Sequence, residues 1–440
     1  SVSLLLVCVE KKATVWRKLW SNLLKEKTFL RYNLIDNVMN DKSTYCVTNG
    51  FDAKFKPLKS YKHIVFCFPH ANSLGIVRAI AKGGLNPIVV CIGKINEDSG
   101  FFHSKYVKEC CRFATPSEGL DFIIRNFSDE NHKNFLYLMA DFGIRICDER
   151  YDELKNSFFF FNSGKANYLS PYLNKDKLCD LAVSCGLPVP NFEIVKRGCL
   201  PKKLTYPIFI KTNNSFSNWK SDAGIAHNEQ ELVELCDSFA SDEWMMEDFI
   251  DKKFEDSWQG ISVNGGQQVY MPYRKRYVRL RKNDYGTYMY YEACQPPKEI
   301  AAGIQQMLRS MNFSGCFEVE FLLDKNDQLH FLEINPRFSA SNQGMFVGGV
   351  NMPLEWALSV LKGNVDEASI MLRESPYYVM NEFMDFSKHV LSGNISIIKW
   401  IKDLKNSLCL YYYQKGDTSP FYSELKIRIQ RKIKKIFKKQ

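Results

Sequence analysis

The chain has 440 residues, of which 45% are hydrophobic and 25% are charged. This composition excludes a fibrous or largely disordered protein, and at roughly 100–200 residues per domain the length allows about two to four domains. The net charge is +10, but residues 424–440 alone carry eight Lys or Arg and one acid. The rest of the chain is therefore close to neutral, which argues against a nucleic-acid-binding body with basic residues spread over one face.

The 14 cysteines of the chain form no CxxC pair and no Cys/His spacing suited to zinc. Several lie in apolar runs, as Cys67 and Cys91 do, so we expect buried free thiols in a reducing compartment. No run approaches the roughly 18 apolar residues of a membrane span. These features predict a cytoplasmic protein.

The first 60 residues have no clear role, with a strand expected over 3–9 and a helix over 16–29. Alternating strands and helices begin at about residue 61. Strands are expected at 62–68, 87–92, 135–139 and 158–161, and helices at 74–82 and 119–126. This alternation predicts an α/β domain with an open parallel sheet over residues 61–170.

A second, α+β unit is expected over residues 171–365, before a C-terminal segment at 366–440. It begins with a helix inside 174–190 and has a second helix at 298–311. Its expected strands are 206–211, 244–250, 260–263, 268–273, 317–323 and 329–334.

A polar loop follows the first strand of the parallel sheet, His70-Ala-Asn-Ser-Leu-Gly75. Open α/β sheets bind ligands at the carboxyl ends of their strands, so Asn72 and Ser73 are candidate substrate contacts. The loop lacks the full GxGxxG pattern of a dinucleotide site, and a purely structural turn is the alternative.

The most informative stretch is a predicted hairpin, FEVEFLLD followed by QLHFLEINPR. Glu320 can face Glu333 across the two strands, and Asn335 shares a face with Glu333. Hard oxygen ligands of this kind suit Mg²⁺, so these three residues are candidate metal ligands. Arg337 follows two residues later and is placed to meet developing negative charge.

An exposed acidic hairpin is the alternative to a metal site. Glu318, Glu320 and Glu333 interrupt otherwise apolar strands. Carboxylates buried without a cation cost several kcal/mol or shift their pKa values, which favours a bound cation.

This hairpin resembles the metal-binding hairpin of the ATP-grasp superfamily, which implies a two-lobed ATP-grasp domain after an N-terminal pre-ATP-grasp domain. It also implies ATP and Mg²⁺ as cofactors, with Mn²⁺ as the other candidate cation. Lys175 and Lys211 resemble the family's two phosphate-contacting lysines. The stretch 244–250 resembles the strand along the adenine, with base contacts at Glu247, Asp248 and Ile250 and a ribose contact at Glu255. The loop after Lys211 departs from the family, because it has no glycine before Gly224.

The resemblance implies a ligase that activates a carboxylate as an acyl phosphate and joins it to an amine, with Lys211 and Arg337 as catalytic residues. The segments 70–78 and 104–106 resemble carboxylate–amine ligases of the D-aspartate ligase type. That type implies an amino acid or other small carboxylate and an amine acceptor, here a cell-wall or surface-glycan precursor. A non-catalytic ATP-binding regulator and a carboxyphosphate-forming enzyme are the alternatives.

Two basic segments complete the sequence. Arg274 and Arg276 share one face of a predicted strand and are candidate substrate contacts, with a solvated basic face as the alternative. Residues 424–440 read as a basic amphipathic helix, suited either to peripheral contact with the inner face of the membrane or to docking on the protein itself. The expected partners are thus small molecules, a membrane surface and a second copy of the chain in a homodimer, but no nucleic acid.

Overall fold

A computed structural model describes residues 51–129, 131–213, 222–279, 286–340 and 342–437. The strand expected over 3–9, the helix expected over 16–29 and most of the loop after Lys211 lie outside these residues. Every cysteine in the described ranges is free. Within the same ranges, no helix is both long and apolar enough to cross a membrane.

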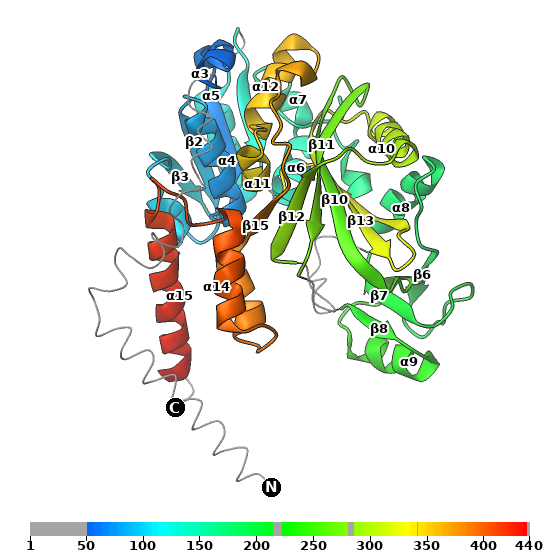
Figure 1. The fold of residues 1–440 in the computed structure, drawn as a ribbon. Helices are drawn as coiled ribbons and strands as arrows, with labels where there is room; N and C mark the ends of the chain where they lie inside the picture. Colours follow the sequence, from blue (N-terminus) through cyan, green and yellow to red (C-terminus); the bar gives the residue numbers. More distant parts are fainter. Residues whose placement is uncertain (1–50, 130, 214–221, 280–285, 341, 438–440) are drawn as a thin grey trace.

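The first sheet is parallel and has the strand order β3-β2-β1-β4-β5 (Figure 1). Its strands are β1 (His63–Cys67), β2 (Pro87–Ile92), β3 (Glu109–Phe113), β4 (Asn134–Leu138) and β5 (Phe158–Phe159). The central strands β1 and β4 are buried along their whole length, which is why they read as continuous apolar runs. The helices of this unit are α4 (Ala71–Lys82), α5 (Pro116–Phe127), α6 (Asp141–Glu149) and α7 (Tyr151–Leu154).

The strand order reverses between β1 and β4. From β1 the chain moves outward to β2 and β3, and it then returns to the other side of β1 to form β4 and β5. In open α/β sheets such a reversal leaves a crevice at the carboxyl ends of the two strands. The loops that lead into α4 and α6 border this crevice.

A smaller antiparallel sheet follows, with the order β6-β9-β7-β8. Its elements are β6 (Phe192–Lys196), β7 (Ile208–Thr212), β8 (Gly224–Ala226), β9 (Glu243–Asp248) and the helices α8 (Lys175–Ser184) and α9 (Glu229–Ser238). Ile208, Ile210 and Trp244 belong to a buried cluster separate from the main core. This lobe therefore has a small core of its own.

The largest sheet has seven described strands in the order β14-β13-β10-β11-β12-β15-β16. They are β10 (Lys252–Val263), β11 (Gln268–Tyr277), β12 (Tyr288–Ala293), β13 (Gly315–Asp324), β14 (Leu329–Asn335), β15 (Tyr377–Met380) and β16 (Ser407–Leu410). The helices that follow β12 and β14 are α10 (Lys298–Ser310), α11 (Asn342–Val347) and α12 (Met352–Lys362). A parallel sheet followed by antiparallel and mixed sheets confirms the expected fold class.

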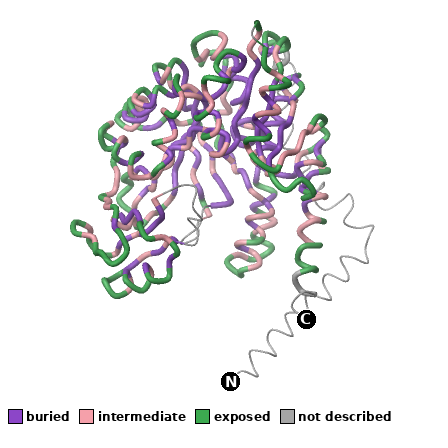
Figure 2. Tube along the Cα trace, turned by 180° about the vertical axis from the view of Figure 1, so that it is seen from behind, coloured by how far each residue is buried: buried purple, intermediate pink, exposed green. Residues whose placement is uncertain are grey.

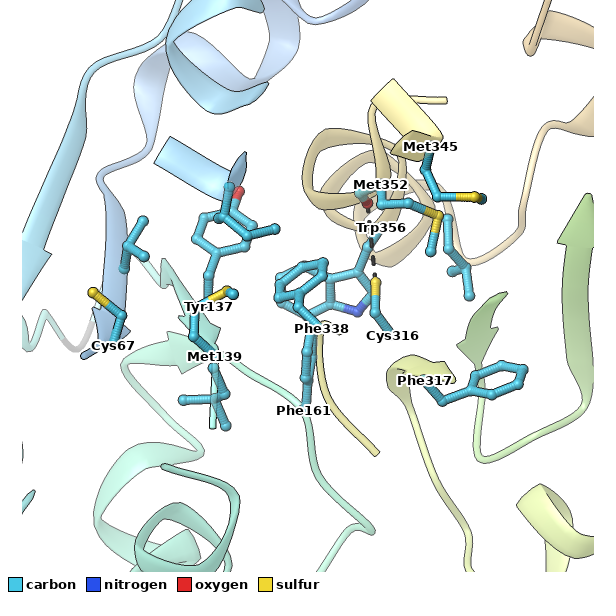
Figure 3. Packing of buried hydrophobic residues seen from close by; sticks show 14 of the residues in the cluster. Cys67, Tyr137, Met139, Phe161, Cys316, Phe317, Phe338, Met345, Met352 and Trp356 are labelled. Carbon is cyan, nitrogen blue, oxygen red and sulfur yellow. Dashed lines mark hydrogen bonds between the residues drawn. The ribbon is translucent and has the colours of Figure 1, made fainter. Parts of the chain in front are cut away.

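Aromatic side chains join the parallel sheet to the large sheet in one continuous core (Figure 3). The ring of Trp356 on α12 lies 4.7 Å from Phe161 and 5.5 Å from Tyr137 on β4, measured between ring centroids. Phe338, just after β14, packs 5.0 Å from Phe161. The hairpin therefore has a fixed position against the carboxyl ends of the parallel strands.

The C-terminal segment adds α13 (Glu382–Asp385), η5 (Phe386–Val390), α14 (Ile397–Asn406) and α15 (Ser419–Phe437). Buried Arg78 on α4 fixes this segment to the parallel-sheet unit, because its guanidinium bonds the Asp417 carboxylate and three backbone carbonyls. Both α14 and α15 project from the body, and their distal parts are exposed (Figures 1 and 2).

Candidate active site

The hairpin β13–β14 brings two carboxylates and one amide together. The register places Glu320 directly opposite Glu333, and Glu318 opposite Asn335. The side-chain nitrogen of Asn335 lies 3.3 Å from Glu320 Oε1 and 3.0 Å from Glu333 Oε1. The three candidate metal ligands therefore converge on one point, as the sequence predicts.

The electrostatics of this point favour a cation. Burial raises the pKa of Glu320 well above its ordinary value, and the nearby carboxylates of Glu318 and Glu333 raise it further. A divalent cation would relieve both effects, and the oxygen-rich donor set fits Mg²⁺. No three His, Cys, Asp or Glu side chains in the described ranges form a metal-binding group; the candidate set consists of two carboxylates and the amide of Asn335.

A buried ion pair lies beside the metal ligands on the same face of the sheet. Lys275 on β11 donates to Glu318 at 2.5 Å, and the Ser257 hydroxyl donates to the same carboxylate oxygen at 2.9 Å. Burial alone would raise the pKa of Glu318, but the charge of Lys275, together with hydrogen bonds from Lys275, Ser257 and Ser339, outweighs burial and the pKa is lowered. Glu318 is therefore an ionised carboxylate held by Lys275.

Lys211 and Glu247 face each other across adjacent strands of the small sheet. Lys211 ends β7, Glu247 lies near the end of β9, and their charged groups are 2.7 Å apart with both side chains nearly buried. Burial alone would lower the pKa of Lys211, but Glu247 raises it above its ordinary value. The ion pair thus favours a protonated Lys211 on β7 of the small sheet.

Lys175 lies close to this pair. It begins α8, and its ammonium donates to the backbone carbonyl of Thr212, the last residue of β7, at 3.2 Å. Burial lowers the pKa of Lys175, and the neighbouring charge of Lys211 lowers it further. Two clustered cations such as these match the charge of a polyphosphate.

Glu333 connects the lysines to the metal hairpin. Its charge acts to raise the pKa values of Lys175, Lys211 and Arg337, so all three cations interact electrostatically with one carboxylate. Residues from α8, β7 and the β14 region, three separate parts of the chain, therefore contribute to one charged site.

Arg337 is held by the N-terminal unit. Its Nε donates to Asp141 Oδ1 at 2.5 Å, and another guanidinium nitrogen donates to Asn335 Oδ1 at 3.2 Å. Asp141 is the first residue of α6 and lies at the carboxyl end of β4. Sequence reasoning did not identify Asp141, although its place after a predicted strand of the parallel sheet was the available signal.

The remaining expected nucleotide contacts follow the lysine pair along the chain. Asp248 ends β9, and its carboxylate accepts from the side chain of Asn191 at 2.8 Å. Ile250 lies two residues later in the connection to β10 and is partly buried. Glu255 on β10 is buried and forms an ion pair with Lys252, and its charge acts to raise the pKa of Glu320.

Arg274 and Arg276 lie on the sheet face opposite the site. Arg276 bonds both oxygens of Asp256 at 2.6 Å, and Arg274 pairs with Glu292. The pleat of β11 sends Lys275 to the face of Glu318 and sends its two arginine neighbours to the other face. The structure therefore does not bring the two arginines to the site, and Lys275 is the basic residue of this run that sequence reasoning missed.

Asn72 and Ser73 lie in the first turn of α4, beside the crevice between β1 and β4. The buried Ser73 hydroxyl donates to the carbonyl of Phe68 at 2.7 Å, which is a structural role within the loop. The amide oxygen of Asn72 is buried, and no described residue bonds it. Of this candidate pair, only Asn72 keeps an unused polar atom near the crevice.

Comparison with curated proteins gives a partial likeness to one kind of enzyme, while no model of a known protein family matches the chain. The chain is 27% identical over 181 residues to N5-carboxyaminoimidazole ribonucleotide synthase of Staphylococcus aureus, covering 39% of this chain and 46% of the relative. The enzyme of the same name from Staphylococcus haemolyticus is 26% identical over 140 residues, or 31% of this chain and 35% of the relative. The chain thus spans less than half the length of these relatives.

Solved structures match a larger share of the fold. N5-carboxyaminoimidazole synthetase from S. aureus has a TM-score of 0.57 at 17% identity, covering 76% of this chain and 86% of that one. An L-amino acid ligase from Bacillus licheniformis has a TM-score of 0.53 at 16% identity, covering 71% and 77%. Biotin carboxylase from Campylobacter jejuni, solved with β,γ-ATP, has a TM-score of 0.55 at 18% identity, covering 72% and 74%. The chain has the fold of the ATP-grasp ligases, which confirms the resemblance expected from its sequence.

Proposed function

We propose that this protein is an ATP-dependent carboxylate–amine ligase that forms an amide through an acyl phosphate, with release of ADP and phosphate. The single observation that carries the proposal is the convergence of Glu320, Glu333 and Asn335 beside Lys211 and Arg337. A regulator that had lost catalysis would have no need to keep buried, like-charged metal ligands together.

Each side chain has a role that its chemistry supports. Lys175 and Lys211 hold phosphate oxygens, while Glu247, Asp248 and Ile250 border the adenine and Glu255 meets the ribose. Glu320, Glu333 and Asn335 would hold Mg²⁺, or Mn²⁺ in its place, which would offset negative charge on the phosphates of ATP.

The reaction then has two steps. An oxygen of the substrate carboxylate bonds to the γ-phosphorus as the bond to ADP breaks. The amine nitrogen then bonds to the acyl carbon, and phosphate leaves. Arg337 donates hydrogen bonds to the oxyanion that develops in the second step, and Asp141 and Asn335 hold its guanidinium in place.

We further propose an amino acid as the carboxylate and a cell-wall or surface-glycan precursor as the acceptor, with the enzyme at the inner face of the cytoplasmic membrane. The fold likeness to an L-amino acid ligase supports an amino-acid substrate. The basic helix α15 supports peripheral membrane contact, because a lipid-linked acceptor would reside at that surface.

A carboxyphosphate-forming enzyme is a second candidate. It is favoured by the likeness of 181 residues to N5-carboxyaminoimidazole ribonucleotide synthase. In that case bicarbonate would take the place of the amino-acid carboxylate. The two candidates share the nucleotide site and differ only in what attacks the γ-phosphorus.

The test is Mg²⁺-dependent phosphate release from ATP. Amino acids in both enantiomers are supplied singly and in pools, with and without uronic-acid acceptors, and bicarbonate is supplied separately. Glu333→Gln should abolish release, whereas Glu374→Gln, at an exposed position outside the site, should not. Release that depends on one amino acid supports the ligase, and release that depends on bicarbonate alone supports the second candidate. ATP binding without release under any condition would contradict both.

A further inference from the structure

Two adjacent isoleucines at the tip of a projecting helical hairpin are exposed. The hairpin consists of η5, the connection 391–396 and α14, and Ile397 and Ile398 begin α14. Ile398 is 78% exposed and Ile397 is 45% exposed. Trp400 and Leu404, three and seven residues after Ile397, continue the face of Ile397 and are partly and fully buried, whereas Ile398 lies on another face and contributes little to packing of the body.

The base of the hairpin is firmly anchored. Arg279, at the end of β11, bonds both Asp385 on α13 and Asp403 on α14. The ring of Trp400 packs edge-on against Phe386 with 5.1 Å between centroids. The tip is thus held on an anchored support, where Ile398 faces away from the core and Ile397 is half exposed.

Beyond the tip, toward the C-terminal end of α14, the exposed face of the helix is basic. Lys402 and Lys405 follow Ile398 at positions four and seven residues later, which places them in one stripe on the helix. Lys399 is also exposed, and the only acid of the helix, Asp403, is bound by Arg279. The stripe therefore has an apolar end and a cationic flank.

The helix α15 lies against the base of the same hairpin. Phe383 of α13 stacks on Phe421 with 4.9 Å between centroids, and the Arg428 guanidinium lies 5.1 Å from the Phe383 ring. The first half of α15 docks on the body, where Glu424 accepts from the backbone amide of Gly100 at 3.1 Å. Its distal half exposes Lys432, Ile433 and Lys434 and projects from the same side as α14 (Figure 1).

We infer that the tip of α14 and the distal half of α15 form one surface that binds an anionic lipid bilayer. Ile397 and Ile398 enter the headgroup region, and the lysines of both helices meet lipid phosphates. The inference rests on the membrane contact proposed for residues 424–440 and adds a second contact element to it. The phosphates of a nucleic acid would bind the lysines but would not bury the two apolar side chains. A bilayer offers both phosphates and an apolar interior, so we take it as the partner of this surface.

The test is co-sedimentation of the full chain with phosphatidylcholine vesicles, with or without phosphatidylglycerol. Binding should require phosphatidylglycerol and should weaken as salt is raised. The double variant Ile397→Ser/Ile398→Ser should bind about tenfold more weakly. The control Met371→Ser changes an apolar residue that is 85% exposed before β15, and it should bind like the wild type. Equal thermal unfolding of all three proteins confirms that folding is intact.

The outcomes separate the inference from the proposals on which it rests. Equal binding of the wild type and the tip variant would overturn the role of α14 and leave α15 as the membrane element. Absence of binding by the wild type would overturn the membrane surface altogether. Release of bound protein by a short RNA, with no effect of the isoleucine changes, would assign the lysines to nucleic acid and overturn the inference. None of these results bears on the proposed ligase activity, which is tested separately by phosphate release in solution.

Discussion

Arg337 and Asp141 form an ion pair that links the metal hairpin to the parallel sheet, with 2.5 Å between Arg337 Nε and Asp141 Oδ1. The two residues are 196 positions apart in the sequence. The pair sits at the carboxyl end of β4, where the order of strands reverses. It positions the proposed oxyanion-stabilising guanidinium from outside the sheet that holds the candidate metal ligands.

Asp141→Asn should slow the acyl-transfer step without weakening ATP binding. The guanidinium would lose a charge-assisted hydrogen bond, so we expect about tenfold slower phosphate release. Asp152→Asn is the matched control, because Asp152 on α7 is 71% exposed and pairs only with the side chain of Lys155. Turnover and nucleotide affinity are measured together. A loss of ATP affinity as large as the loss of turnover would contradict a positioning role for Asp141.

Lys211→Met should reduce both stability and nucleotide binding. The substitution leaves Glu247 buried without its partner, which costs about 3 kcal/mol of unfolding free energy. Replacing both residues, in Lys211→Met/Glu247→Leu, should restore most of the stability because no buried charge remains. Neither variant should bind ATP. Urea unfolding and titration calorimetry check the two effects, and ATP binding by the double variant would remove Lys211 from the phosphate site.

Lys275→Met should destabilise the protein in a pH-dependent way. In the wild type Lys275 lowers the pKa of buried Glu318, so this pair contributes stability above the ordinary glutamate pKa and loses it as pH falls. In the variant, only the hydrogen bonds from Ser257 and Ser339 oppose burial, and the pKa of Glu318 should rise. We expect a loss of about 3 kcal/mol at neutral pH that shrinks as the pH is lowered and Glu318 becomes protonated. A pH-independent difference from the wild type in urea unfolding would show that the pair is not ionised.

Because His63 is buried, we expect the unfolding free energy of the protein to fall in mild acid. Burial lowers its pKa to about 4, and the hydrogen bond to the Leu58 carbonyl opposes this only in part. The unfolded chain takes up a proton near pH 6.5, whereas the folded chain does so only near pH 4. The unfolding free energy should therefore fall by about 3 kcal/mol between these pH values. His63→Gln should have a correspondingly flatter pH profile, and identical slopes for the two proteins would exclude His63 as the source.

The local parts of the fold and site were determined by the sequence. Continuous apolar runs predict the buried strands β1, β2 and β4, because a parallel sheet covered on both faces needs them. The metal hairpin is also local, since a short turn fixes its register and places Glu320 opposite Glu333. The first part of β10, from Lys252 to Gln259, and the strands β15 and β16 were not expected, since polar stretches and short strands give weak periodic signals.

The tertiary structure alone decided which charges meet. Alternation places Arg274 and Arg276 on one face of β11, but only the pairing of β11 with β10 and β13 shows that the site lies on the other face, with Lys275. In the same way, Asp141 meets Arg337, and α15 docks its first half while leaving its distal half exposed. Sequence periodicity reports which residues share a face of one element. Contacts between elements far apart in the chain depend on how the sheets pack, and that packing is a property of the whole core.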